Sequence, residues 1–268
     1  MEINFMNFKD KVVYQIYPKS FQDTNGDGIG LMLDMVFNHT STEHKWFQKA
    51  LAGEKKYQDY YIFREGNPEH LPTNWESKFG GPAWEYVPSL KKWYLHLFDV
   101  TQADLNWDNP EVREELKQVV RFWKEKGVKG FRFDVVNLIS KPEKFENDMD
   151  GDGRRFYTDG PHVHEYLKEL VKDTGIEEMV TVGEMSSTTL ENCIRYSNPA
   201  ERELSMCFHF HHLKDEKKYW KESAKMLAVM IHLMRWNTIY LSGRGTGNDQ
   251  RPLYVHRSIS GCGEPELL

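Results

Sequence analysis

The order of helix-forming and strand-forming segments limits the folds open to this chain. Asn109 and Pro110 begin a helix, because Asn is a favoured helix cap and Pro is tolerated at the first helical position. Gly127 ends that helix directly before the apolar run 128–134, and residues 161–183 repeat the same pattern of helix, glycine and apolar run. Such alternation builds parallel sheets. We therefore expect an α/β fold with a mostly parallel sheet.

Further segments fit this scheme or interrupt it. Apolar runs predict strands at 12–17, 31–37 and 203–210, and residues 223–234 predict an apolar helix in which His232 is a core residue. Residues 40–107 are rich in Trp, Tyr, Gly, Pro and Asn and favour an insertion into the βα series. The helix that begins at Pro110 should bury one stripe of side chains: Val112, Leu116, Val119, Val120 and Trp123.

Composition excludes several classes of protein. The 268 residues carry a net charge of −6 with acidic and basic residues interspersed, so we expect no nucleic-acid partner. No segment approaches the roughly 20 apolar residues of a membrane span, and the start of the chain does not resemble a signal peptide. Cys193, Cys207 and Cys262 show neither disulfide nor metal-ligand spacing. These features predict a cytoplasmic protein with no membrane partner.

Two apolar runs end in a charged residue. Asp134 closes the run 128–134, and Glu184 follows the run 179–183. A carboxylate at the tip of a buried strand needs a partner, and Arg132 lies two residues before Asp134 on the same strand face. Two carboxylates on neighbouring strand tips are also what glycoside hydrolysis requires. Structural ion pairs at strand ends are the alternative interpretation.

Three strings in order resemble the α-amylase-type glycoside hydrolase family. They are Leu-Asp-Met-Val-Phe-Asn-His at 33–39, Gly-Phe-Arg-Phe-Asp at 130–134 and Val-Gly-Glu at 182–184. The resemblance implies a (β/α)8 TIM barrel with a small domain inserted after the third strand.

The same resemblance assigns roles to four residues. It implies that Asp134 is the catalytic nucleophile and Glu184 the general acid/base. It also implies that Arg132 and His39 bind substrate, with Arg132 keeping Asp134 ionised and oriented.

Other strings resemble particular branches of the family. Residues 14–21 and 102–107 resemble oligo-1,6-glucosidases, whereas 137–161, 184–189 and 208–214 resemble trehalose-6-phosphate hydrolases. The expected reaction is therefore hydrolysis of trehalose 6-phosphate to glucose and glucose 6-phosphate, with an oligo-1,6-glucosidase or another α-glucosidase as the alternative. The substrate would be a phosphorylated disaccharide or an α-glucoside. Candidate phosphate contacts, with solvated surface charge as the alternative, are Arg154, Arg155, His211, His212 and Lys214.

Residues 23–29 read as the first half of a calcium loop. Asp23, Asn25, Asp27 and Ile29 alternate along it, and a glycine stands at the sixth place. The resemblance implies a divalent cation, Ca²⁺, at these four residues. A plain Asx/Gly turn is the alternative.

The chain departs from the family at two places. After Gly30 the family continues through a helix and a second strand, for which this chain has no residues. The carboxylate that closes the calcium loop is lost with them. After Lys214 the family's Asn-His-Asp string, which carries a third acidic residue, is missing. We therefore expect a barrel without its second and seventh strands, and hence a sheet that does not close.

The last part of the chain predicts a frameshift near Arg235. Residues 238–250 have no family counterpart as written, although codons can be chosen whose neighbouring frame resembles the family's eighth strand. The predicted organisation is the start of the catalytic barrel in 1–39, an inserted subdomain in 40–107, the remainder of the barrel in 108–234 and a frameshifted tail in 235–268. We expect an impaired fragment without turnover above background; a non-catalytic remnant is the alternative.

Overall fold

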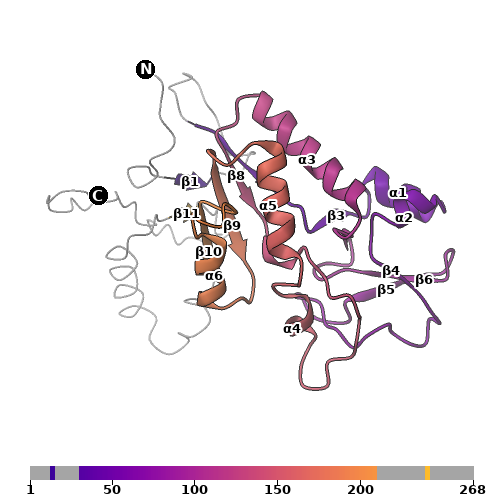
Figure 1. Ribbon diagram of the computed structural model, residues 1–268. Coiled ribbons are helices and arrows are strands. Elements are labelled where there is room, and N and C mark those ends of the chain that lie inside the picture. The colour runs from indigo at the N-terminus through magenta and orange to yellow at the C-terminus, as the bar shows by residue number, and fades with distance from the viewer. Residues whose placement is uncertain (1–12, 16–29, 210–238, 242–268) are drawn as a thin grey trace, which may run out of the picture. The chain divides into compact units, whose positions relative to one another are not determined.

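The computed structural model describes residues 13–15, 30–209 and 239–241, and the chain divides into two compact units. One unit comprises residues 1–29 and 211–268; the other comprises residues 30–210. In the first unit, β1 (Val13–Gln15) pairs in parallel with β11 (Ile239–Leu241) (Figure 1). The expected strand at 12–17 is thus present in part. The helix expected at 223–234, with His232, lies outside the described residues.

The second unit is built on a four-stranded parallel sheet. Its strands lie in the order β10-β9-β8-β2, which reverses their order along the chain. They are β2 (Met32–Met35), β8 (Gly130–Phe133), β9 (Val180–Met185) and β10 (Met206–His209). The sequence prediction of a parallel sheet is confirmed. In the described part of the chain β2 and β10 are the edges of this sheet; the absence of a second and a seventh strand stays a prediction.

Helix α3 (Pro110–Glu125) begins as expected but buries a narrower stripe. The side chain of Asn109 caps it by accepting the Glu111 N–H at 2.9 Å. Val119 and Trp123 were expected in the buried stripe, but they are 36% and 39% exposed. The buried residues of α3 are Val112, Leu116, Val120 and Lys117, and the last of these, 7% exposed, lies on the flank of the helix that faces α5.

Helix α5 (Val163–Thr174) lies beside α3 against the sheet (Figure 1). Gly175 ends it with φ +63°, a left-handed conformation that glycine adopts without steric cost. The Lys117 ammonium lies 2.9 Å from a carboxylate oxygen of Glu169 and 2.9 Å from one of Asp173, both on α5. With Glu114 of α3 at 3.2 Å, this buried ammonium contacts three carboxylates.

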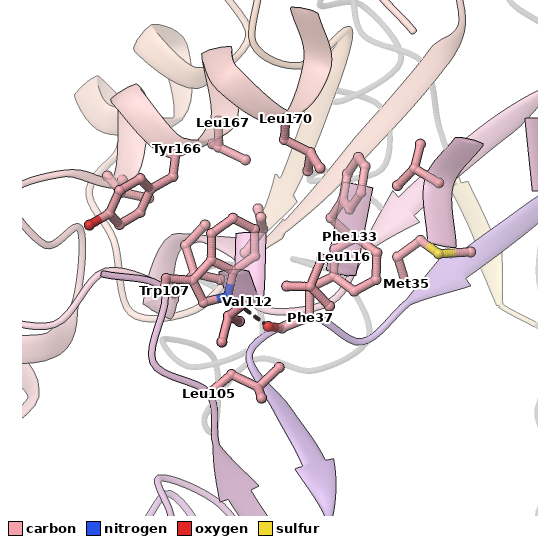
Figure 2. Packing of buried hydrophobic residues seen from close by; sticks show 14 of the residues in the cluster. Met35, Phe37, Leu105, Trp107, Val112, Leu116, Phe133, Tyr166, Leu167 and Leu170 are labelled. Carbon is pink, nitrogen blue, oxygen red and sulfur yellow. Dashed lines mark hydrogen bonds between the residues drawn. The ribbon is translucent and has the colours of Figure 1, made fainter. Parts of the chain in front are cut away.

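The main core fills the space between these helices and the sheet. Figure 2 shows Leu167 and Leu170 of α5 pointing toward Phe133 of β8. Close by, the indole N–H of Trp107 donates to the carbonyl of Phe37 at 2.8 Å. One face of β8 thus packs against the helix layer, and its other face is available for polar groups.

The segment between β2 and α3 forms antiparallel sheets. β3 (His39–Ser41) pairs with β7 (Gln102–Asp104), and a three-stranded sheet has the order β4-β6-β5. The other elements here are α1 (Lys45–Leu51), α2 (Lys55–Gln58), β4 (Phe63–Glu65), β5 (Trp84–Val87) and β6 (Lys92–Leu95). That this segment is a separate inserted subdomain stays a prediction.

Short helical elements complete the described structure. They are the 3₁₀ turn η3 (Val136–Leu138), α4 (Arg154–Tyr157) and α6 (Leu190–Tyr196). Among the helices that the structure describes, none combines the length and apolar character needed to cross a bilayer.

Candidate active site

The strand register brings the charged residues to one edge of the parallel sheet. Arg132 of β8 stands opposite Asp34 of β2 on one side and Val182 of β9 on the other. Phe131 and Phe133 are fully buried in the core below the helices. Because successive side chains alternate between the faces of a strand, Arg132 projects from the opposite face. The carboxyl ends of parallel strands are the usual position for a binding site in such folds.

Arg132 contacts three carboxylates at once. Its Nη1 donates to Asp34, and its Nη2 donates both to Oδ1 of Asp134, at 2.9 Å, and to Oε2 of Glu184. The side chains of Arg132, Asp134 and Glu184 are 15%, 22% and 14% exposed, whereas that of Asp34 is 46% exposed. The expected pairing of Arg132 with Asp134 is confirmed. We call these four residues the strand-tip cluster.

The shared nitrogen limits the distance between the two expected catalytic carboxylates. Asp134 and Glu184 both accept from Nη2 of Arg132, so their nearest oxygens lie within two hydrogen-bond lengths, about 6 Å. Retaining glycosidases separate their carboxyl groups by about 5–5.5 Å and inverting ones by about 6.5–9.5 Å. The contact therefore allows the retaining geometry.

The charges of the strand-tip cluster do not cancel. One guanidinium faces three carboxylates, and Nε of Arg132 is buried without a hydrogen-bond partner in the described residues. Burial alone would lower the pKa of Arg132, but the carboxylates of Asp34, Glu184 and Asp134 outweigh burial, so the pKa is raised. Burial raises the pKa of Glu184, the charge of Asp134 adds to this, and Arg132 opposes it. Glu184 therefore holds a proton to higher pH than an ordinary glutamate, as a general acid requires.

Backbone strain follows Asp134 immediately. Val135 has φ +37° and ψ +39°, a left-handed conformation that is costly for a β-branched residue. The N–H of Asp134 donates to the carbonyl of Met35 at 3.0 Å, which fixes the end of β8 against β2. The carboxylate thus stands at a tight turn whose geometry is held by the neighbouring strand.

His39 lies in a buried position near this cluster. Its Nε2 is 2.9 Å from Nε2 of Gln102, and its ring centroid is 5.2 Å from that of Phe98. Burial lowers the pKa of His39, although the charges of Asp104 and Asp134 oppose the shift. His39 is therefore harder to protonate than an ordinary histidine, and its Nδ1 also lies 3.3 Å from Nδ2 of Asn38.

A second buried ionic group lies beside His39. Nζ of Lys141 is 2.8 Å from Oδ2 of Asp104 and 2.8 Å from Oδ1 of Asn38. Nδ2 of Asn38 donates to the same Asp104 oxygen at 2.9 Å, and the N–H of Leu97 donates to the other one at 2.9 Å. All three polar side chains are 4% exposed or less. We call Asn38, Asp104 and Lys141 the Asp104–Lys141 group.

Comparison with known proteins agrees with this geometry. Residues 27–246 match the family described as "Alpha amylase, catalytic domain". The chain belongs to the α-amylase family.

Comparison with individual members of the α-amylase family is more specific than the family match. Trehalose-6-phosphate hydrolase of Bacillus subtilis (strain 168) is 44% identical over 328 aligned positions, which cover 93% of this chain and 58% of that protein. Oligo-1,6-glucosidase of Parageobacillus thermoglucosidasius is 36% identical, with 93% and 59% covered. A crystal structure of a mutant Bacillus licheniformis trehalose-6-phosphate hydrolase in complex with PNG matches with 43% identity and a TM-score of 0.70. It covers 77% of this chain and 50% of that one. The chain thus spans between half and three fifths of the length of these three proteins.

The neighbouring strands of an α-amylase-type (β/α)8 barrel explain why these side chains converge.

The remaining candidate residues of the sequence analysis do not lie in the strand-tip cluster. Arg154 pairs with Asp152 at 2.9 Å and Arg155 with Asp148 at 2.7 Å, so aspartates of their own loop already match both charges. Two further phosphate candidates lie outside the described residues, as do the four predicted calcium ligands. They are His212 and Lys214, and Asp23, Asn25, Asp27 and Ile29. Within the described part, no group of three His, Cys, Asp or Glu side chains is arranged to hold a metal ion.

Sequence reasoning assigned no role to Asp34 or to the Asp104–Lys141 group. Asp34 is the one charged residue in the apolar run 31–37, which is the signal that could have identified it. Asp104 likewise sits between the apolar residues Ala103 and Leu105, but its pairing with Lys141 over 37 positions of sequence has no local signature.

Proposed function

We propose that the chain derives from a retaining α-glucosidase and carries its two catalytic carboxylates. The observation that supports this most is that one nitrogen of Arg132 bridges Asp134 and Glu184. This contact keeps the two carboxylates close enough for the retaining mechanism.

In this mechanism each carboxylate acts twice. Asp134 attacks the anomeric carbon while Glu184 gives its proton to the bridging oxygen, so the glycosidic bond breaks and a glycosyl ester forms on Asp134. Glu184, now ionised, takes a proton from water, which attacks the same carbon and releases Asp134. The raised pKa of Glu184 suits the first step, and the Arg132 guanidinium, 2.9 Å from the Asp134 carboxylate, holds that side chain in place.

The substrate that we favour is trehalose 6-phosphate, which would yield glucose and glucose 6-phosphate. The relative from Bacillus subtilis supports this choice, and the one from Parageobacillus thermoglucosidasius keeps an oligo-1,6-glucosidase as the second candidate. Arg154, His212 and Lys214 stay the proposed phosphate contacts. Of these, Arg154 would have to exchange its partner Asp152 for phosphate.

We further propose that the chain as written is impaired. The alignment with the Bacillus subtilis relative spans 328 positions, more than the 268 residues of this chain, so the relative has residues within the matched region that this chain lacks. This supports the two predicted gaps. The Asn-His-Asp string, with its third acidic residue, falls in the second gap, and loss of one preorganised electrostatic partner costs about 10²–10³ in rate.

Repair of the gaps tests both proposals together. In the repaired chain, residues of the Bacillus subtilis relative are inserted after Gly30 and after Lys214 and replace residues 235–268. Purified monomers of both chains are assayed for glucose release from trehalose 6-phosphate, from isomaltose and from a nitrophenyl α-glucoside. We expect no turnover from the chain as written and turnover from the repaired chain.

Asp134→Asn in each background is the control. Turnover of the chain as written that this substitution abolishes would contradict impairment and leave the catalytic pair intact. A folded repaired chain without turnover would contradict the glucosidase proposal and favour a non-catalytic remnant. Preference for isomaltose would select the oligo-1,6-glucosidase alternative.

A further inference from the structure

The turn after Asp134 is tied to the backbone after Glu184. Asn137 lies in η3, three residues beyond Asp134, and is fully buried. Its Oδ1 accepts the N–H of Ser186 at 2.8 Å, and its Nδ2 donates to the carbonyl of the same Ser186 at 2.9 Å. The two bonds close a ring between a side-chain amide and a backbone segment two residues beyond Glu184.

This ring stands where the sheet ladder stops. The last register pair between β8 and β9 is Phe133 with Gly183, so Asp134 and Glu184 both lie just past it. The ladder holds the two chains together before the carboxylates, and Asn137 holds them together after. The pair is therefore fixed from both sides, although two like charges repel each other.

Asp159 fixes the orientation of Asn137. Its Oδ1 accepts from Nδ2 of Asn137 at 3.1 Å and from the hydroxyl of Tyr196 at 2.7 Å. Its Oδ2 accepts from Nδ2 of Asn192 at 2.8 Å and from the hydroxyl of Thr188. The Asp159 N–H also donates to the carbonyl of Asn137 at 2.9 Å. With both amide hydrogens engaged, Asn137 has one orientation that satisfies all its partners.

We propose that Asn137 is a positioning residue whose amide sets the separation of Asp134 and Glu184 by clamping Ser186. This proposal rests on the proposed function, because the glucosidase mechanism is what assigns catalytic roles to the two carboxylates. A misplacement of about 1 Å at such a pair can cost 10²-fold in rate. Arg132 cannot do this alone, because it contacts only the side chains of the pair and does not join the two backbone segments that follow them.

Two measurements on the full chain test the clamp without turnover. Amide hydrogen exchange by NMR reports the Ser186 N–H. The ¹³C carboxyl shift, assigned with Glu184→Gln, reports the titration of Glu184. The charged groups that act on this carboxyl are Arg132, Asp134 and Asp34. The matched variants are Asn137→Ala and Asn192→Ala, which each remove one donor to Asp159, whereas only the first removes the clamp.

In the unsubstituted chain we expect the Ser186 amide to be protected. In Asn137→Ala its exchange should accelerate about tenfold, and the midpoint of Glu184 should fall toward that of an ordinary glutamate as water reaches the carboxyl. In Asn192→Ala neither should change. Asn137→Ser, which keeps a polar side chain but is one atom too short for either contact, should give a similar result to Asn137→Ala.

Three results would overturn the proposal. The first is a Ser186 amide that exchanges in the unsubstituted chain as fast as an unprotected one, which requires no variant to fold. The second is an unchanged Glu184 titration in folded Asn137→Ala or Asn137→Ser. The third is an equal effect of Asn192→Ala. Because no outcome depends on catalysis, failure here is distinguishable from failure of the repaired chain to turn over.

Discussion

The strand-tip cluster and the Asp104–Lys141 group are both buried ionic groups, yet they differ in charge balance. Arg132 faces three carboxylates, one of which, Asp34, is 46% exposed. Lys141 faces one carboxylate, Asp104, which is fully buried. The first group carries excess negative charge that reaches solvent. The second is matched one to one and sealed.

This difference in charge balance suggests that the strand-tip cluster is a functional site and that the Asp104–Lys141 group stabilises the fold. A buried pair that is balanced and fully hydrogen-bonded has no capacity to take up further charge, and breaking it leaves an uncompensated ion. An unbalanced group at a partly open edge can accept a proton and stabilise a developing positive charge, as an oxocarbenium ion requires. We therefore expect substitutions in the strand-tip cluster to affect rate, and substitutions in the Asp104–Lys141 group to affect stability.

The largest expected effect on rate comes from Glu184→Gln in the repaired chain. Loss of the proton donor should lower kcat for trehalose 6-phosphate by about 10²–10⁴. The loss should be smaller for a nitrophenyl α-glucoside, whose leaving group needs less protonation. Glu191→Gln, at an exposed position on α6, is the matched control. Equal losses on both substrates would remove Glu184 from the role of acid.

The largest expected effect on stability comes from Lys141→Met. It leaves Asp104 buried without its cation and should lower the free energy of unfolding in urea by about 3–5 kcal/mol. Lys56→Met is the control, because Lys56 and its partner Glu111 are 55% and 59% exposed. It should cause no measurable loss. Equal losses of unfolding free energy in the two variants would contradict the structural role that we assign to the Asp104–Lys141 group.

Arg132→Lys should lower kcat of the repaired chain by about 10²-fold, because a point charge cannot hold three carboxylates in a fixed geometry. Steady-state kinetics on trehalose 6-phosphate measures this, and the unfolding free energy should change far less than in Lys141→Met. Unchanged turnover would exclude Arg132 from the site.

The smallest expected effect is on pH dependence. Burial lowers the pKa of His39 below 6.5, so its contribution to stability is present above pH 6.5 and is lost as pH falls through the lowered pKa. His39→Gln should therefore flatten the decline in unfolding free energy between pH 7.5 and pH 5. His70→Gln, at an exposed position, should leave that decline unchanged. A steeper decline in His39→Gln would reverse the sign of this argument.

Local signals in the sequence predicted much of this structure. The Asn109 cap, the Gly175 stop and the apolar runs that became β2, β8 and β9 are each determined by neighbouring residues. The partners of Lys117 and Lys141 were not predictable, because each depends on tertiary packing between distant segments. The role of Asp34 depends on the strand register, which places it opposite Arg132 and which no local pattern specifies.

Covalent trapping tests most directly whether Asp134 and Glu184 form a retaining pair. The repaired chain is incubated with 5-fluoro-α-glucosyl fluoride, digested and analysed by peptide mass spectrometry. A retaining mechanism predicts one fluoroglucosyl group esterified to Asp134, and none in the Asp134→Asn variant. A label on Asp34 or Glu184, or turnover that inverts the anomeric configuration without a label, would contradict it.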